Sequence, residues 1–110
     1  MLRFEQAIAS FDKAIEIKPD YYQAWYNRGV KLDELLRFEQ AIASFDKAVE
    51  IKPDYYEAWY NRGSSLGELL RFEQAIASFD KAVEIKPDYY QAGIEKVPYF
   101  LMNLLNMKRL

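Results

Sequence analysis

The twelve residues RFEQAIASFDKA at positions 3–14 return letter for letter at 37–48 and again at 71–82. A proline follows each copy, at positions 19, 53 and 87, and sets a period of 34 residues. A fixed period between about 20 and 50 residues is typical of arrays whose units cannot bury their apolar faces alone. The sequence therefore predicts a stack of like units.

The composition of the chain indicates a folded domain and argues against several kinds of functional site: metal, cofactor and nucleic-acid sites. A chain of 110 residues, 51% hydrophobic and 29% charged, is expected to fold as one domain. It has no Cys and no His, so the commonest metal ligands, thiol nucleophiles and imidazole bases are missing. A net charge of −2 provides no basic field for nucleic acid. We expect no metal, no cofactor and no nucleic-acid partner.

Acidic side chains are plentiful, but they do not indicate catalysis. Glu5, Asp12 and Glu16 lie on the polar side of the helical pattern and recur with the repeat. Catalytic groups are expected to be singular and desolvated, whereas these are copied and exposed. We therefore expect no catalytic residues and no enzymatic activity.

No targeting or spanning segment is expected. The opening MLRFEQAIAS carries Glu5 where a secretory signal needs an apolar core, and no apolar run approaches the ~20 residues that cross a bilayer. Membrane-surface binding by the C-terminal segment is disfavoured because it ends on only two cations, Lys108 and Arg109. We expect a cytoplasmic protein, although the lack of Cys permits any compartment.

The middle copy predicts an amphipathic helix that ends at Lys52, because Pro53 cannot continue the hydrogen-bond ladder. Asp54 is expected to cap the next helix, with Glu57 completing a capping box. The apolar residues of the first of these helices recur at the i, i+3, i+4, i+7 spacing of one stripe: Phe38, Ala41, Ile42, Phe45, Ala48, Val49 and Ile51.

The intervening segment predicts a second kind of helix, which carries Trp25 and Gly29 in one copy and Trp59 and Gly63 in the next. A glycine in mid-helix costs about 1 kcal/mol relative to Ala, so its return suggests a close approach of two backbones. We expect Gly29 to meet Ala41, and Gly63 to meet Ala75. Each unit is then a helical hairpin.

Together these residues resemble the tetratricopeptide repeat over positions 2 to about 92. The pattern is filled in order by Trp25, Gly29, Phe38, Ala41, Phe45, Ala48 and Pro53, and again by Trp59, Gly63, Phe72, Ala75, Phe79, Ala82 and Pro87. The resemblance implies an all-α, right-handed superhelical α-solenoid of stacked antiparallel helical hairpins, with about six helices. We expect a repeat array over 1–92 that starts with a second-type helix, and a divergent amphipathic capping helix over 93–110.

Two departures from the family pattern bear on the fold. Arg28 and Arg62 stand where the family usually has an aliphatic residue, so their stems are expected to lie along the packing with the charge led out to water. The family often has Gly in the turn between the two helices, but here it reads Leu35-Leu36-Arg37. Two alternatives stay open: a break at this turn, or fusion into one long helix with domain swapping.

Apolar faces at the two ends suggest self-association. Phe4, Ala7 and Phe11 lie on a second-type helix that no first helix precedes in this sequence. The C-terminal segment either caps its own last repeat or fills that open slot in another copy, giving a dimer, a domain swap or an open head-to-tail chain. Its apolar face is formed by Phe100, Leu101, Leu104 and Leu105.

The resemblance also implies a concave groove lined by the first helices, and with it a scaffold for protein–protein interaction. Amide side chains can bond the backbone of an extended peptide while tyrosine rings stack on its side chains. The alternatives are surface tyrosines without a ligand, or a self-assembling structural piece. The expected groove residues are Gln23, Tyr26, Asn27, Val30 and Asp33 in one copy and Glu57, Tyr60, Asn61 and Ser64 in the next.

One family activity can be compared by position, the clamp that grips the C-terminal carboxylate of heat-shock chaperones. Asn27 and Asn61 match its asparagine position, but its cation positions carry Gln, Glu, Tyr or Asn. Without charge-assisted bonds a carboxylate is held poorly. With Asp33, Glu34, Glu57 and Glu68 near the groove, the sequence predicts a neutral or basic peptide.

Overall fold

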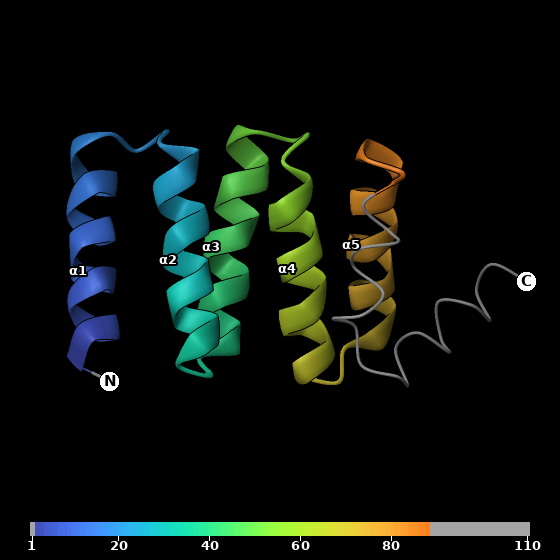
Figure 1. Ribbon diagram of the computed structural model, residues 1–110, viewed down its shortest axis with the longest axis horizontal. Helices are drawn as coiled ribbons and strands as arrows, with labels where there is room; N and C mark the ends of the chain where they lie inside the picture. The colour runs from blue at the N-terminus through green and yellow to red at the C-terminus, as the bar shows by residue number, and fades with distance from the viewer. Residues whose placement is uncertain (1, 89–110) are drawn as a thin grey trace, which may run out of the picture.

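The computed structural model describes residues 2–88, which form five α-helices in one row (Figure 1). The repeat pattern is confirmed as an all-α stack of antiparallel helix pairs. The expected capping helix over 93–110, with Phe100, Leu101, Leu104 and Leu105, lies outside the described residues, as does the end of the repeat array. The helices are α1 (Leu2–Ile17), α2 (Tyr22–Glu34), α3 (Phe38–Ile51), α4 (Tyr56–Glu68) and α5 (Phe72–Ile85).

Each helix packs on its neighbours in the chain. The first helices of the repeats, α2 and α4, form hairpins with the second helices α3 and α5 that follow them. Helix α2 also packs on α1, and α4 packs on α3. Each first helix thus lies between two second helices, and α2 and α4 meet each other as well.

The turn between the two helices of a repeat is a definite break, which decides between the two alternatives left open by the sequence. Leu36 takes a left-handed conformation with φ 62°, and Leu70 does the same with φ 63°. The amide of Leu36 donates to the carbonyl of Asp33 at 2.9 Å, and that of Arg37 to Leu32 at 2.8 Å. This is a Schellman ending, in which Leu occupies the position usually filled by Gly.

The expected capping box at Asp54 is wrong. Helix α4 starts after Tyr55, and no side chain caps its first turn. Pro53 and Asp54 are instead the central residues of a turn closed by a bond from the Tyr55 amide to the Lys52 carbonyl, at 3.1 Å. The N-cap position is Tyr55, so Asp54 lies one residue before it. The Asp54 carboxylate pairs with the Lys52 ammonium at 3.4 Å.

The indole of Trp59 holds this turn closed, because its Nε1 donates to the carbonyl of Pro53 at 2.8 Å. Trp25 makes the same bond to Pro19 at 2.9 Å. Because proline and tryptophan recur at the same spacing in each repeat, this hydrogen bond joins the end of one hairpin to the start of the next.

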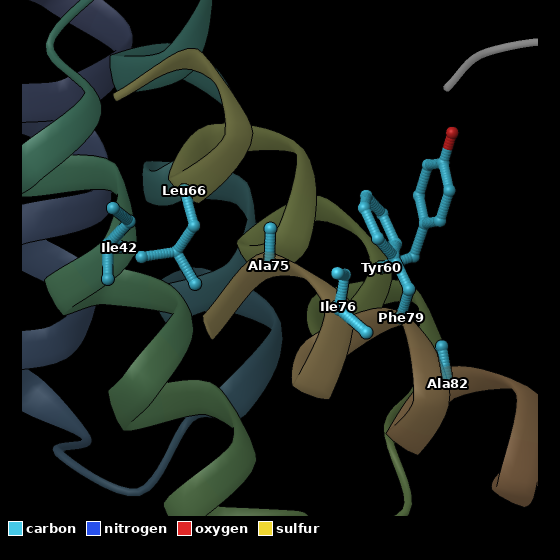
Figure 2. Packing of buried hydrophobic residues seen from close by; sticks show 7 residues of the cluster. All are labelled: Ile42, Tyr60, Leu66, Ala75, Ile76, Phe79 and Ala82. Atoms are coloured by element: carbon cyan, nitrogen blue, oxygen red, sulfur yellow. The ribbon is translucent and has the colours of Figure 1, made fainter. Parts of the chain in front are cut away.

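The core follows the predicted stripes. Ala41 and Ala48 are completely buried, and Phe45 is 1% exposed. In the next repeat, Leu66 lies between Ile42 and Ala75 (Figure 2). Apolar contacts thus run continuously from one hairpin to the following one.

The glycines allow close packing: the expected approach to a backbone is found for Gly63 and Ala75 but not for Gly29 and Ala41, and in both cases a phenylalanine ring lies nearer. A Cβ on Gly29 would lie 2.6 Å from the ring of Phe45, and the backbone of Ala41 is not among its nearest atoms. A Cβ on Gly63 would lie 2.9 Å from the Phe79 ring and 3.1 Å from the carbonyl oxygen of Ala75. The space is filled mainly by the phenylalanine ring, which lies in the densely packed core.

The Arg28 side chain is 22% exposed, but its charge is not simply led out to water as expected. Its Nε donates to the Asp12 carboxylate of α1 at 2.6 Å, and its Nη1 donates to the buried hydroxyl of Ser44 of α3 at 2.7 Å. Arg62 repeats both bonds, to Asp46 at 2.5 Å and to Ser78 at 2.6 Å. These arginines join three successive helices and satisfy hydroxyl groups that no water reaches.

Candidate peptide-binding face

The predicted groove residues lie on α2 and α4, the two first helices, which contact each other. We call this set the groove face: Gln23, Tyr26, Asn27, Val30 and Asp33 on α2, and Glu57, Tyr60, Asn61 and Ser64 on α4. Within it Gln23 and Asn27 are exposed, Tyr60 is buried, and the other six are half-buried.

Tyr26 and Asn61 connect the two halves of the groove face. The amide nitrogen of Asn61 donates to the Tyr26 hydroxyl at 2.8 Å. The Tyr26 ring packs 4.9 Å from that of Tyr55, which in turn meets Tyr22 edge-on at 5.3 Å. These contacts hold Tyr26 in one orientation, so part of a ring is presented at the surface without further ordering.

Burial, followed by the proximity of Tyr26 and Glu57, raises the pKa of Tyr55 to about 12. The hydroxyl of Tyr55 therefore stays protonated over the physiological range.

The two asparagines of the groove face differ in their hydrogen bonding and exposure. Asn61 uses its amide for the bond to Tyr26, whereas Asn27 is exposed and has no side-chain partner within residues 2–88. The two tyrosines differ as well: Tyr60 is 7% exposed and lies 5.3 Å from the Phe79 ring, beside which Figure 2 shows it. Of the two asparagines, Asn27 is therefore the one whose amide is open to a ligand.

Asp33 links the two helices at the other end of the face. The buried hydroxyl of Ser65 donates to its carboxylate at 2.7 Å. Burial raises the pKa of Asp33 above its usual value, the bond from Ser65 opposes the rise, and the negative charge of Glu34 adds to it. Asp33 is thus a carboxylate with reduced solvation, and a cation placed beside it would lower its pKa again.

The groove face carries carboxylates but no cation of its own. Asp33 and Glu57 are its charged members. Two lysines contact tyrosines that adjoin the groove face. Lys52 lies over the Tyr22 ring, 5.3 Å from its centroid. Lys86 donates to the Tyr56 hydroxyl at 3.2 Å, a bond that raises the pKa of the lysine.

Sequence reasoning did not include Tyr22, Tyr55 and Ser65 in the site. The two tyrosines come from the DYY segments after each proline, and their recurrence at the repeat period was the available signal. No comparable signal existed for Ser65, because the matching position in the preceding repeat is Lys31. Its role follows from the approach of α4 to α2.

The part of the chain that the structure describes contains no cluster of three or more acidic side chains arranged to hold a metal ion. Within the same residues, none of the helices has the length and apolar character needed to cross a membrane.

Comparison with known proteins agrees with this geometry. A family model described as "Tetratricopeptide repeat" matches residues 22–55 and 56–89, and one described as "TPR repeat" matches residues 3–32. No curated protein matches the sequence.

Several solved structures are similar. The Arabidopsis OM64 TPR domain has TM-score 0.75 and 28% identity, over 77% of this chain and 70% of that one. MamA from Desulfovibrio magneticus RS-1 has TM-score 0.72 and 25% identity, over 77% of this chain. This chain spans 48% of that MamA chain, about half its length.

A third similar structure is the first TPR of Spaghetti (RPAP3) bound to the HSP90 peptide SRMEEVD. It has TM-score 0.78 and 21% identity, over 96% of this chain and 76% of that one. At this identity the similarity concerns the fold alone.

Proposed function

Because the chain belongs to the tetratricopeptide repeat family, we propose that it is a non-catalytic protein-interaction module whose groove face binds an extended peptide of neutral or positive charge. The observation that carries this proposal is the exposed amide of Asn27, unpaired within residues 2–88, next in the chain to the oriented ring of Tyr26. An amide offers both a donor and an acceptor to a peptide backbone, and a ring offers a stacking surface.

Preorganisation supports the same proposal. Tyr26 is held by Asn61 and by the Tyr55 ring, so it loses little rotational freedom when a ligand binds. Immobilising a free side chain costs about 0.5–1.5 kcal/mol on association. Because the fold already immobilises Tyr26, binding of a peptide does not incur this cost for that side chain.

Charge sets the class of peptide. The groove face holds Asp33 and Glu57 but neither Lys nor Arg. A similar TPR domain has been captured with SRMEEVD, a peptide with two Glu and one Asp. Charge-assisted bonds to such carboxylates need cationic donors that this face lacks, so a peptide whose net charge is neutral or positive fits it better.

The test is fluorescence anisotropy with a library of extended peptides that vary in charge, with SRMEEVD as the acidic reference. We expect basic and neutral members to bind more tightly than SRMEEVD. Asn27→Ala should weaken binding about five- to tenfold, which corresponds to one hydrogen bond of about 1–1.4 kcal/mol.

Gln40→Ala is the matched control, because it also removes an exposed amide but lies on α3, outside the groove face. It should bind like the unchanged protein. Equal loss in both variants, tightest binding of SRMEEVD, or no binding of any library member would overturn the proposal.

A further inference from the structure

The two first helices differ in sequence mainly at one end of the groove face. Residues 20–36 and 54–70 match at every position except four. Three of the differences lie close together, at Val30, Lys31 and Asp33, which correspond to Ser64, Ser65 and Gly67. Two of these positions meet in space, because the buried hydroxyl of Ser65 donates to the Asp33 carboxylate at 2.7 Å. This contact belongs to one place in the described array, since Gly67 has no carboxylate with which to repeat it.

Asp33 presents an oriented carboxylate that lacks a cation. An ionised carboxylate can accept about four hydrogen bonds, and the bond from Ser65 uses one of them. Within residues 2–88, Asp33 takes part in no ion pair. Burial raises its pKa, and the one charged neighbour that shifts this pKa is the negative Glu34. The carboxylate is therefore held in place with capacity for a charge-assisted bond.

Glu57, the other carboxylate of the groove face, is in a different electrostatic environment. Its negative charge contributes to the raised pKa of Lys86, so the two groups favour each other's charged forms. No cation of this kind acts on Asp33 among the described residues. Asp33 is thus the carboxylate of the groove face that gains most from a cation supplied by a ligand.

Asp33 also lies on the same side of α2 as Tyr26 and Val30. Residues four and seven positions apart project from one face of an α-helix, and all three are half-buried. Seven residues at 1.5 Å each place Asp33 about 10 Å from Tyr26 along the helix. A ligand that contacts both residues must span this distance.

An extended peptide can span it with two neighbouring side chains of the same face. Alternate side chains of an extended chain point the same way and lie about 7 Å apart. The methylene stem of Lys or Arg covers the remaining few ångströms, and the half-buried Val30 offers that stem an apolar surface between the two contacts.

We propose that Asp33 is the specificity-determining residue of the groove face, where it binds the ammonium of Lys or the guanidinium of Arg two residues from the peptide side chain that stacks on Tyr26. Ser65 is the positioning residue that orients the carboxylate. This inference rests on the proposed peptide-binding function and adds to it the chemical class and the position of one ligand side chain.

The test uses three synthetic nine-residue peptides with blocked termini, a central Tyr and otherwise Ser and Gly. The spaced peptide carries Lys two residues before and two residues after the Tyr, so that either direction of the bound chain presents one Lys to Asp33. The adjacent peptide carries its two Lys directly beside the Tyr, where they point away from the face that the ring contacts. The neutral peptide has Gln in place of both Lys of the spaced peptide.

Fluorescence anisotropy should show that the spaced peptide binds about tenfold more tightly than the neutral one, as expected for one charge-assisted hydrogen bond. The adjacent peptide has the same charge as the spaced peptide and should bind like the neutral one. Asp33→Asn keeps an acceptor for Ser65 and removes the charge, so it should bind the spaced peptide no better than the neutral one. Its affinity for the neutral peptide should be unchanged.

Glu50→Gln is the matched control for the loss of one negative charge. Glu50 is an exposed carboxylate of α3 that pairs with Lys47 at 3.7 Å, outside the groove face. This variant should keep the tenfold preference for the spaced peptide.

Three results would each overturn the inference: equal binding of the spaced and neutral peptides, an adjacent peptide that binds as tightly as the spaced one, or a preference that persists in Asp33→Asn. The proposed function would stand in all three cases if binding still weakened in Asn27→Ala. If none of the three peptides bound, the inference would fail, and the proposed function would fail with it only if no member of the charge-varied library bound either.

Discussion

Replacing Leu36 and Leu70 with glycine should stabilise this protein. Both leucines hold left-handed conformations, with φ of 62° and 63°. Both are also mostly exposed, at 73% and 68%, so their side chains contribute little to the core. The Schellman ending requires the left-handed backbone conformation, but it does not require a leucine side chain at this position.

The magnitude follows from two opposing effects. The left-handed region costs a residue with a Cβ about 1–2 kcal/mol, which glycine avoids. Glycine in turn loses more backbone entropy on folding, about 0.5–1 kcal/mol relative to Ala. We therefore expect a net gain of about 0.5–1 kcal/mol for each substitution, and about twice that for the double variant since the two turns are separate.

Urea and thermal unfolding measure this directly. For a domain of this size, 1 kcal/mol corresponds to a rise in Tm of about 4–8 °C. Glu34→Gly is the matched control, because it places glycine in the last turn of α2, where the backbone is helical; it should lose about 1 kcal/mol. If Leu36→Gly left stability unchanged or lowered it, the explanation from backbone strain would be refuted.

Three further substitutions test the packing. Gly29→Ala should destabilise by about 1–3 kcal/mol in urea unfolding, because its Cβ would lie 2.6 Å from the ring of Phe45; a loss below about 0.5 kcal/mol would mean that the ring can shift. Asn61→Ala should cost about 1 kcal/mol through loss of its bond to the tyrosine hydroxyl of the preceding repeat, and an unchanged denaturation midpoint would contradict that role. Asp33→Asn retains an acceptor for Ser65 and removes a carboxyl whose pKa is raised by burial. A raised pKa in the folded state means that stability is lost as pH rises through that pKa, so the variant should exceed the unchanged protein at pH 7 and match it below the usual pKa of 3.8; an equal difference at both pH values would show that charge is not the cause.

Most of the fold was predictable because it depends on local periodicity repeated at a fixed interval. The stripe on residues 38–51 predicted a helix that ends at Lys52, and the helix ends one residue earlier, at Ile51. The glycines predicted close packing, which occurs. The phenylalanine rings were not predicted as their nearest neighbours, because helical spacing identifies which side of a helix faces inward, but not which side chain from the neighbouring helix fills the space.

The wrong prediction at Asp54 and the turn left open at Leu36 have a common origin. Asp54 has the composition of a cap, yet the turn that follows Pro53 uses it as a central residue and moves the helix start to Tyr56. Leu36 has no preference for the left-handed region, yet the stacking of α2 on α3 requires the chain to reverse there. In both places the tertiary arrangement overrides the local preference of the residue.

The candidate groove face was predicted by position, whereas the differences between its members were not. Asn27 and Asn61 are indistinguishable in the repeat pattern, but only Asn61 has the tyrosine of a preceding repeat within reach. Tyr26 and Tyr60 likewise share a position and differ in exposure. Identical residues at equivalent positions of the repeat make different contacts, because their neighbours in space differ from one repeat to the next.

By itself, then, the sequence determined the repeat length, the helical hairpin and the side of each helix that faces the core, since these follow from the order of apolar residues along one chain. Only the tertiary structure decided that Arg28 joins Asp12 to Ser44 and that Leu36 carries the strain of the turn. These features depend on distances between residues that are far apart in sequence. Such distances are set by how the helices stack, not by the pattern within any one of them.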